Sequence, residues 1–336
     1  MTAGVDTAAE DRELRLSREA TVPRGLVHVR ALSEVFIADH RQLDPESYAT
    51  ALQITRSHQL WGDRLVPFHD PVITLEVGRQ SVFLVVHNYL EIPGNWKFVL
   101  NRIDFRVTDL EAYRDDYRVP PEGTARVRLL HRRDRHGLFE GGFEGEARIG
   151  ERRAMEMSAE ITVLSPYNYK LVRAYGRGSK PLESAPGPPG PERLPTAAVG
   201  RSNPRNVVLH ERVEEGEREG ELRFGLLIDE GHPGFFDHPH DHVTGSLILE
   251  FFRQAAIVAA HRLEALSPAD VVVTACSMRF KEFAELDALT SCAARIADSA
   301  LGRATVDLEL LQAGARIAWA TLELTEVEGR GEALAG

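Results

Sequence analysis

Four chemically versatile residue types recur in this chain at one fixed interval. The offset in residue number is constant (250 − 76 = 174 and 261 − 87 = 174), and it relates Leu75, Glu76, Arg79, Gln80 and His87 to Leu249, Glu250, Arg253, Gln254 and His261. A carboxylate, a guanidinium and an amide held close together are suited to proton transfer and to binding a polar or anionic substrate. A long unit repeated once indicates a duplicated domain, because solenoids need shorter units and at least three of them.

The same offset relates two loops that contain histidine. SHQLWGD (57–63) is matched by GHPGFFD (231–237), so His58 and His232 correspond as well (232 − 58 = 174). The second loop continues as DHPHDHV (237–243), in which His238, His240 and His242 alternate and could converge on a metal. Their spacing misses the H-x-H-x-D-H pattern of metallohydrolases by one residue, and no cysteine is nearby. We therefore predict no metal and no other cofactor.

The composition limits the class of protein. The chain has 336 residues, enough for about two domains, and 43% of them are hydrophobic, as in ordinary globular proteins. Its net charge of −11 argues against nucleic-acid binding, which needs a basic surface. The sequence shows no apolar run long enough for a membrane span and no signal peptide, so we predict a cytoplasmic protein. Cys276 and Cys292 form no CxxC motif and are expected to be reduced, structural thiols.

Proline, glycine and hydrophobic periodicity divide the chain into five segments. We expect a mobile tail (1–25), a first domain (26–174), a Pro/Gly-rich linker (175–202), a second domain (203–328) and a short tail (329–336). Each domain reads as two short strands, a histidine loop, one long apolar helix and then strands only. The predicted helices are 72–90 and 246–264. The predicted strands are 34–39, 48–56, 96–107, 124–131, 143–149 and 153–164, then 206–211, 222–229, 271–280, 289–297, 303–312 and 315–327. One helix for each antiparallel sheet predicts an α+β fold.

The second predicted helix carries its polar residues as one stripe. At about 100° per residue, Glu250, Arg253, Gln254 and His261 fall on the same side, and nearly all other positions are apolar. Such a helix is normally buried, and a buried polar group without a partner costs about 1–3 kcal/mol, a charge more. The stripe must therefore be satisfied within the protein, for example by an internal Glu–Arg ion pair that fixes the packing, or it must line a wet pocket.

A helix with glutamate and glutamine on it, wrapped by an antiparallel sheet, resembles the hotdog fold. Hotdog 3-hydroxyacyl-carrier-protein dehydratases place a catalytic histidine in a loop ahead of a helix with the pattern L-x-x-E-x-x-x-Q. The segment DHPHDHVTGSLILEFFRQ offers, in that order, His238, Gly245, Glu250 and Gln254. Thr244 stands where the dehydratases have proline.

The chain is more similar still to the A-factor biosynthesis (AfsA-like) family of actinobacteria. Its members are tandem hotdogs with the segments HDP…E..RQ and DHP.DHV.G…LE..RQA, and this chain has HDPVITLEVGRQ (69–80) and DHPHDHVTGSLILEFFRQA (237–255). The resemblance covers about residues 26–327 and implies a tandem (double) hotdog, each unit a long central helix wrapped by a curved antiparallel sheet. It further implies an acyltransferase that moves a β-ketoacyl group from acyl carrier protein to a hydroxyl of dihydroxyacetone phosphate, the first step toward γ-butyrolactone-type signalling molecules.

The resemblance makes Glu76, Glu250 and Arg253 the important residues. Burial raises the pKa of a carboxyl group, which suits a general base, and His238 could share that role. The N–H of Gly245, at the start of the second helix, is the expected oxyanion donor. The hotdog dehydratases often combine a histidine and an acid from opposite protomers, so His238 and Gly245 could work with Glu76 or with Glu250 of their own unit.

Substrate contacts are expected first from Arg253 and then from Arg79, because a guanidinium binds phosphate through two parallel hydrogen bonds. The further expected substrate-binding residues are Gln254, Gln80, His232 and His58. His87 and His261 lie late on their helices, where a positive charge complements the helix dipole, so a structural role is expected for both. Pro71, five residues before Glu76, has no N–H and makes the first unit the poorer site.

Several alternatives remain open from the sequence. Acyl carrier protein is usually acidic, so docking would need a basic patch such as RVRLLHRRDRHG (126–137), which could equally be a solvated hairpin. The chain could instead be a 3-hydroxyacyl-thioester dehydratase or hydratase, a thioesterase, or a non-enzymatic protein that binds acyl thioesters. The expected assembly is a monomeric pseudo-dimer or a homo-oligomer.

Overall fold

The computed structural model describes residues 14–180 and 192–327 in two compact units. The first unit comprises the chain up to Gly62 together with Phe68–Lys170, and the second comprises Asp63–Pro67 together with the chain from Leu171 onward. Residues 1–13, 181–191 and 328–336 lie outside the described residues, and with them half of the predicted N-terminal tail, the proline-rich centre of the predicted linker and the predicted C-terminal tail. Among the described helices, none is long and apolar enough to cross a membrane.

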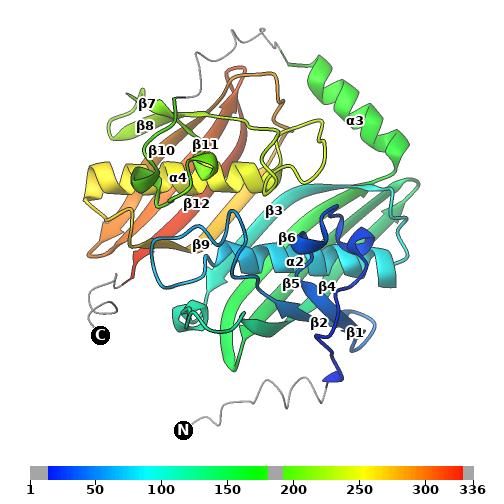
Figure 1. The fold of residues 1–336 in the computed structure, drawn as a ribbon. Helices are drawn as coiled ribbons and strands as arrows, with labels where there is room; N and C mark the ends of the chain where they lie inside the picture. The colour runs from blue at the N-terminus through cyan, green and yellow to red at the C-terminus, as the bar shows by residue number, and fades with distance from the viewer. Residues whose placement is uncertain (1–13, 181–191, 328–336) are drawn as a thin grey trace. The chain divides into compact units, whose positions relative to one another are not determined.

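Six antiparallel strands form the sheet of the first unit, in the order β1-β2-β4-β5-β6-β3 (Figure 1). Their bounds are β1 Ile37–Gln42, β2 Ser47–Gln53, β3 Lys97–Val107, β4 Glu122–Arg135, β5 Leu138–Ile149 and β6 Arg152–Leu164. Alternation sets the faces: in β4, Ala125, Val127 and Leu129 are buried, and the arginines between them are exposed. The helix α2 (Val72–Leu84) continues into one π-helical turn (Val85–Tyr89) and packs its valines on this apolar face.

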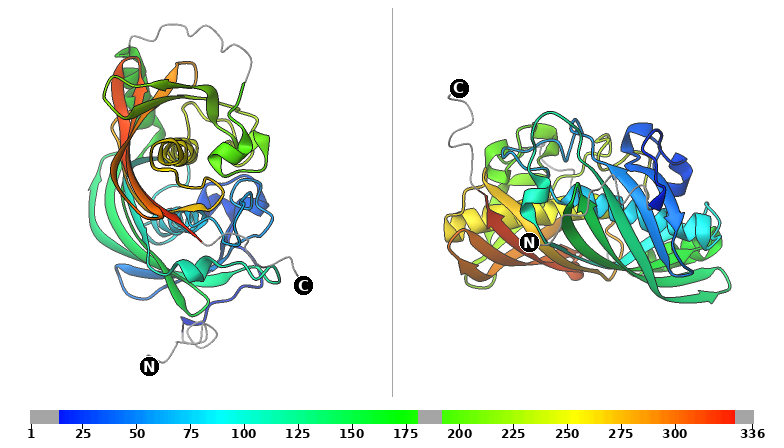
Figure 2. Two further views of the ribbon diagram at one scale, coloured as in Figure 1. Left: turned by 90° about the vertical axis from the view of Figure 1, so that its left-hand side faces the viewer. Right: turned by 90° about the horizontal axis from the view of Figure 1, so that it is seen from below.

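The second unit has the same topology, with strand order β7-β8-β10-β11-β12-β9. Its strands are β7 Leu209–Glu215, β8 Glu221–Leu226, β9 Val271–Phe280, β10 Thr290–Ala300, β11 Arg303–Gln312 and β12 Ala315–Glu326. The central helix α4 (Gly245–Glu264) is buried continuously from Leu247 to Ala260. The left view of Figure 2 looks along α4 and shows the strands of this unit curving around it. The predicted tandem hotdog, with one long helix wrapped by each curved sheet, is the fold observed.

Short 3-10 turns precede both sheets and place the residues that contact the central helices. They lie at Arg24–Val27 and Leu32–Glu34 in the first unit, and at Thr196–Val199 and Pro204–Asn206 in the second. A further turn, Leu110–Tyr113, follows β3. The predicted strands 271–280 and 303–312 coincide with β9 and β11, whereas β1 and β7 begin about three residues later than predicted because these turns occupy the predicted strand starts.

The prediction that only strands follow the first central helix was wrong. The helix α3 (Pro166–Gly178) comes after β6 and crosses the predicted domain boundary at residue 174. Its sequence signals were proline at the first helical position and an apolar series at Tyr167, Leu171 and Tyr175, four residues apart. In the structure these three side chains are exposed, whereas Arg173 on another face of the helix is buried, where its guanidinium pairs with Glu285 at 2.9 and 2.8 Å.

Candidate functional site

The polar stripe of α4 is built around a buried ion pair that the sequence did not reveal. Glu250 is 3% exposed, and both of its carboxylate oxygens accept hydrogen bonds from Arg201, from Nε at 3.0 Å and from Nη2 at 2.7 Å. Arg201 is itself only 1% exposed and donates a further hydrogen bond from Nη1 to the carbonyl oxygen of Asp63 at 2.6 Å. The forked guanidinium therefore neutralises the carboxylate and ties it to the Asp63–Pro67 segment.

The remaining groups of the stripe also have partners within the protein. Gln254 Nε2 donates to Glu250 and to the carbonyl oxygen of Asn206, both at 2.6 Å, and Gln254 Oε1 accepts from the Val208 N–H at 3.0 Å. Arg253 Nη1 lies 3.3 Å from both Glu250 Oε1 and the carbonyl oxygen of Val199. The predicted Glu–Arg pair within the helix thus exists, but Arg201 makes the shorter contacts.

The charge state of Glu250 differs from the expectation. Burial alone would raise its pKa, but the positive charges of Arg201 and Arg253, with hydrogen bonds from Arg201 and Gln254, hold that pKa below the ordinary value of a glutamate. The expected raised pKa was wrong because the carboxylate is desolvated together with its counter-charges. Glu250 is therefore an ionised, fully hydrogen-bonded group and is poorly suited to act as a base near neutrality.

The corresponding residues of the first unit repeat the contacts within the helix, from arginine and glutamine to glutamate, and are more exposed. Glu76 accepts from Arg79 Nε at 2.7 Å and Nη2 at 2.6 Å, and from Gln80 Nε2 at 2.9 Å. Gln80 also bonds the carbonyl oxygen of Glu34 at 2.7 Å and the Phe36 N–H at 3.0 Å, as Gln254 does in the second unit. The side chain of Glu76 is 12% exposed and that of Arg79 is 35% exposed, so this pair can meet a bound molecule.

His58 and His232, the loop histidines related by the repeat, each contact a side chain of a preceding 3-10 turn and a backbone N–H of their own loop. His232 Nε2 is 2.8 Å from Asn206 Oδ1, and its Nδ1 accepts from the Gly234 N–H at 3.2 Å. His58 Nε2 is 2.9 Å from Glu34 Oε2, and its Nδ1 accepts from the Leu60 N–H at 3.1 Å. Burial is the main cause that lowers the pKa of His232 to about 4 and keeps its ring neutral. Substrate contacts by these two residues remain predictions.

The late helix histidines have equivalent contacts in both units. The Nδ1 of His87 lies 2.7 Å from the carbonyl oxygen of Ile92, and that of His261 lies 2.8 Å from the carbonyl oxygen of Leu266. In each case the acceptor is five residues further along the chain, so the histidine holds the segment that leaves the helix. These contacts agree with a structural role for both residues, but the expected positive charge is disfavoured on His87, whose pKa is lowered by burial.

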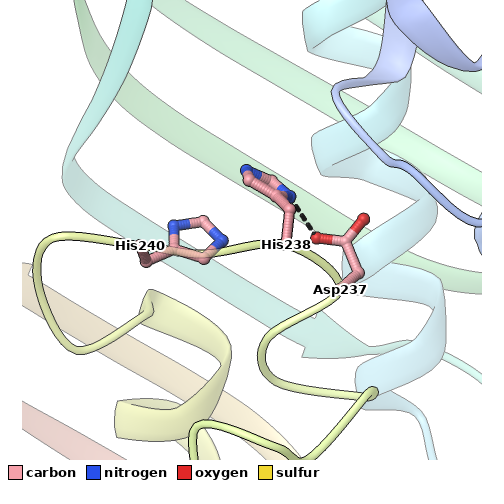
Figure 3. A group of neighbouring side chains, drawn as sticks. All are labelled: Asp237, His238 and His240. Carbon is pink, nitrogen blue, oxygen red and sulfur yellow. Dashed lines mark hydrogen bonds and ion pairs between the residues drawn. The ribbon is translucent and has the colours of Figure 1, made fainter.

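The loop that leads into α4 contains the most accessible candidate for proton transfer. His238 has a 30% exposed side chain, and its Nδ1 is 2.5 Å from Asp237 Oδ1. Figure 3 shows both side chains with that of His240, whose ring centroid is 4.2 Å from that of His238. Burial is the main cause that lowers the pKa of His240 to about 4, so its imidazole is neutral near pH 7. Asp237 was not among the predicted site residues, although its position next to a histidine in the sequence could have indicated it.

The N-terminus of α4 adjoins this loop and differs from that of α2. The N-cap Thr244 accepts a hydrogen bond from the Leu247 N–H at 3.3 Å through its side chain, and Gly245 is the exposed first residue of the helix. The N–H of a first helical residue has no partner within the helix. In α2 the N-cap is Pro71, which has no N–H, so the predicted asymmetry between the two helix starts is present.

The predicted basic patch at 126–137 is largely neutralised by its neighbours on the same sheet. The exposed pairs are Arg128–Glu144 at 2.5 Å, Arg132–Asp134 at 2.6 Å and Arg133–Glu140 at 3.6 Å. This arrangement matches the alternative of a solvated β-hairpin, the turn between β4 and β5. Cys276 and Cys292 are buried and form no disulfide within the described residues, and burial raises the pKa of the Cys292 thiol, in keeping with structural thiols.

Comparisons with known proteins find one family model, several curated relatives and a solved structure that are similar to this chain. Residues 11–120 and 183–328 match the family model described as the A-factor biosynthesis hotdog domain. Curated relatives named 2-oxo-3-(phosphooxy)propyl 3-oxoalkanoate synthase come from Streptomyces coelicolor (27% identical, 79% of each chain), Streptomyces virginiae (28%, 80% of this chain and 85% of the relative) and Streptomyces griseus (28%, 77% and 80%). Among solved structures, the chain is similar to the 12:0-ACP thioesterase from Umbellularia californica, with 9% identity, a TM-score of 0.49 and coverage of 84% of this chain and 94% of that one.

The first prediction contrasts the two glutamates. Glu250→Gln should lower the free energy of unfolding by about 3–5 kcal/mol, because it leaves the Arg201 guanidinium buried without its counter-charge. Glu76→Gln should cost about 1 kcal/mol or less, because Arg79 is partly solvated. Urea unfolding followed by circular dichroism would measure both. Equal losses in the two variants would contradict the proposed difference in burial.

The second prediction concerns acid stability. The folded-state pKa of Glu250 is lowered, so its contribution to stability is complete above the unfolded-state pKa of about 4.3 and is lost as the pH falls through the lower folded-state value. The stability difference between the native chain and Glu250→Gln should therefore shrink as the pH falls below about 4.3. Unfolding measured from pH 7 to pH 3 tests this, and a difference that stays constant over the range would refute it.

Proposed function

The chain belongs to the A-factor biosynthesis hotdog domain family, and on that premise we propose that it transfers a 3-oxoacyl group from a thioester to a hydroxyl of dihydroxyacetone phosphate. Its curated relatives are named for the ester that this reaction would form, a 2-oxo-3-(phosphooxy)propyl 3-oxoalkanoate. Ester formation from an alcohol needs an activated acyl donor, and a thioester of acyl carrier protein is the donor we propose.

The observation that carries the proposal is the hydrogen bond of 2.5 Å between Asp237 and His238, in the loop before α4. A carboxylate bonded to Nδ1 fixes the ring and its tautomer and leaves Nε2 as the proton acceptor, which is the arrangement of an Asp–His pair that activates a hydroxyl. Within the described chain, no hydrogen bond occupies His238 Nε2, in contrast to both nitrogens of His232.

The proposed reaction proceeds in two proton-coupled stages. His238 Nε2 takes the proton from the acceptor hydroxyl as its oxygen forms a bond to the thioester carbonyl carbon, and negative charge develops on the carbonyl oxygen. The N–H of Gly245, reinforced by the partial positive charge at the helix N-terminus, stabilises that oxyanion. The carbon–sulfur bond then breaks, the ester is complete, and the imidazolium returns the proton to the departing thiolate.

The buried ion pair supports this site rather than reacting in it. Arg201 and Gln254 hold the Glu250 side chain in place, so α4 and its N-terminus stay fixed relative to the rest of the second unit. A phosphate bound in the second unit would meet Arg253, and one bound in the first unit would meet Arg79. The side chain of Arg79 is the more accessible of the two, at 35% exposed compared with 7% for Arg253.

The third prediction tests the reaction itself. The purified chain should release thiol from a 3-oxoacyl thioester only when dihydroxyacetone phosphate is present, and the product mass should contain both the acyl and the phosphate groups. His238→Gln should lower kcat by about 10²–10⁴-fold because the base is lost. The matched control is His242→Gln, in the same loop, whose ring pairs with Asp241 at 2.7 Å.

Two outcomes of that assay would overturn the proposal. Thiol release that does not depend on the phosphate acceptor would identify a thioesterase. Addition of water to an enoyl thioester, or its loss from a 3-hydroxyacyl thioester, would identify a hydratase or dehydratase on the same fold.

The fourth prediction isolates the oxyanion donor. Gly245→Pro removes one N–H, and proline is well tolerated at the first helical position after an extended residue such as Thr244 (φ −68°, ψ 150°). A Cβ at Gly245 would meet only Phe280 Cζ, at 4.0 Å. We expect kcat to fall by about 10²–10³-fold in Gly245→Pro. Gly245→Ala retains the N–H and measures the effect of the side chain alone, so equal rates in the two variants would exclude Gly245 as the donor.

A further inference from the structure

The histidine loop brings together three side chains of the kinds that bind transition metals. Asp237, His238 and His240 each offer one ligand atom, and these atoms all lie within 4.8 Å of one another. Figure 3 shows the three side chains projecting from one short stretch of the loop. All three are partly exposed, so an ion can reach them from solvent.

The donor set is characteristic of one class of ion. Two imidazoles and a carboxylate suit Zn²⁺ and its neighbours in the first transition row, whereas Mg²⁺ and Ca²⁺ prefer oxygen ligands alone. Ligand atoms about 2.0–2.2 Å from a tetrahedral zinc are about 3.4 Å apart, so atoms that all lie within 4.8 Å of one another are near the spacing that the ion requires. Three protein ligands leave a fourth position for water or an anion.

The loop that carries these ligands is anchored at both ends. Before it, the N–H groups of Phe235 and Phe236 donate to the carbonyl oxygen of His232, whose buried ring is held by Asn206. After it, the Val243 N–H donates to the carbonyl oxygen of Ala284 at 2.9 Å. A short loop tied at both ends loses little conformational entropy when an ion binds, and this favours affinity.

We infer that Asp237, His238 and His240 bind one Zn²⁺ per chain and that the bound ion silences the site. The sequence predicted no metal here, because the histidine spacing misses the metallohydrolase pattern by one residue and no cysteine is nearby. The inhibitory part rests on the proposed function, since a neutral imidazole has one nitrogen lone pair, and a zinc ion on either ring nitrogen of His238 would leave none to accept the hydroxyl proton. The binding part stands on the cluster alone.

The fifth prediction is measured by direct metal binding. The full-length chain, freed of metal with a chelator, is titrated with Co²⁺ and followed by visible absorption, and then with Zn²⁺ by calorimetry. One ion should bind per chain, and Zn²⁺ should displace Co²⁺ because protein sites with nitrogen and carboxylate ligands in tetrahedral geometry are typical zinc sites. His240→Ala should weaken Zn²⁺ binding by about 100-fold or more, whereas His242→Ala, from the same loop but outside the cluster, should bind as the native chain does.

An activity assay in the presence of Zn²⁺ distinguishes a failure of the metal site from a failure of the proposed function. Zn²⁺ should inhibit thiol release by the native chain, and His240→Ala should need at least about tenfold more Zn²⁺ for the same inhibition. Absent binding, or equal affinities in the His240 and His242 variants, would overturn the metal site and leave the transferase untouched. A chain that binds Zn²⁺ as expected but transfers no acyl group would overturn the proposed function instead. Binding without inhibition would retain the site and overturn its inhibitory role.

Discussion

The second unit depends on the burial of one carboxylate together with its counter-charge. An unpaired charge on a buried, mostly apolar helix would strongly destabilise the fold. Glu250 can be buried because Arg201 donates two hydrogen bonds to its carboxylate, at 2.7 and 3.0 Å. That requirement draws the chain from Val199 to Asn206 against α4, where Arg253 and Gln254 bind its carbonyl oxygens. The segment that positions the first strand of the sheet is thereby fixed to the central helix.

The two units share a framework of hydrogen bonds but differ in how deeply the helix glutamate is buried. Gln80 and Gln254 make the same pair of backbone contacts, and His58 and His232 close equivalent loops. Gln80 contacts the backbone of residues 34 and 36, and Gln254 contacts that of residues 206 and 208, so equivalent positions in this segment are 172 residues apart (206 − 34 = 172 and 208 − 36 = 172). By the same offset the position equivalent to Arg201 is the apolar Val29 (201 − 172 = 29). The first unit therefore has no arginine at that position, and among the described residues Glu76 pairs with Arg79 and Gln80 of its own helix, where it stays partly exposed.

In the second unit the better candidate for a general base is the loop residue His238, and not the helix residue Glu250. A carboxylate whose two oxygens accept several charged hydrogen bonds has a lowered pKa and little capacity to take a proton near neutrality. His238, by contrast, has one ring nitrogen held by Asp237 and a partly exposed side chain. The same accessible lone pair that suits a general base also suits a transition metal, which is why one short loop supports both proposals.

The sequence by itself determined the features that arise from local periodicity and repetition. The constant offset between the two halves, the two central helices, most strands and the buried polar stripe could be predicted, because helix and strand periods are written in neighbouring residues. Only the tertiary structure decided which partner each polar group takes. Arg201 lies 49 residues before Glu250, in a segment that reads as the end of a linker, so no local pattern joins them. The direction of a pKa shift depends on such distant partners, and for that reason the charge state of Glu250 could not be obtained from burial alone.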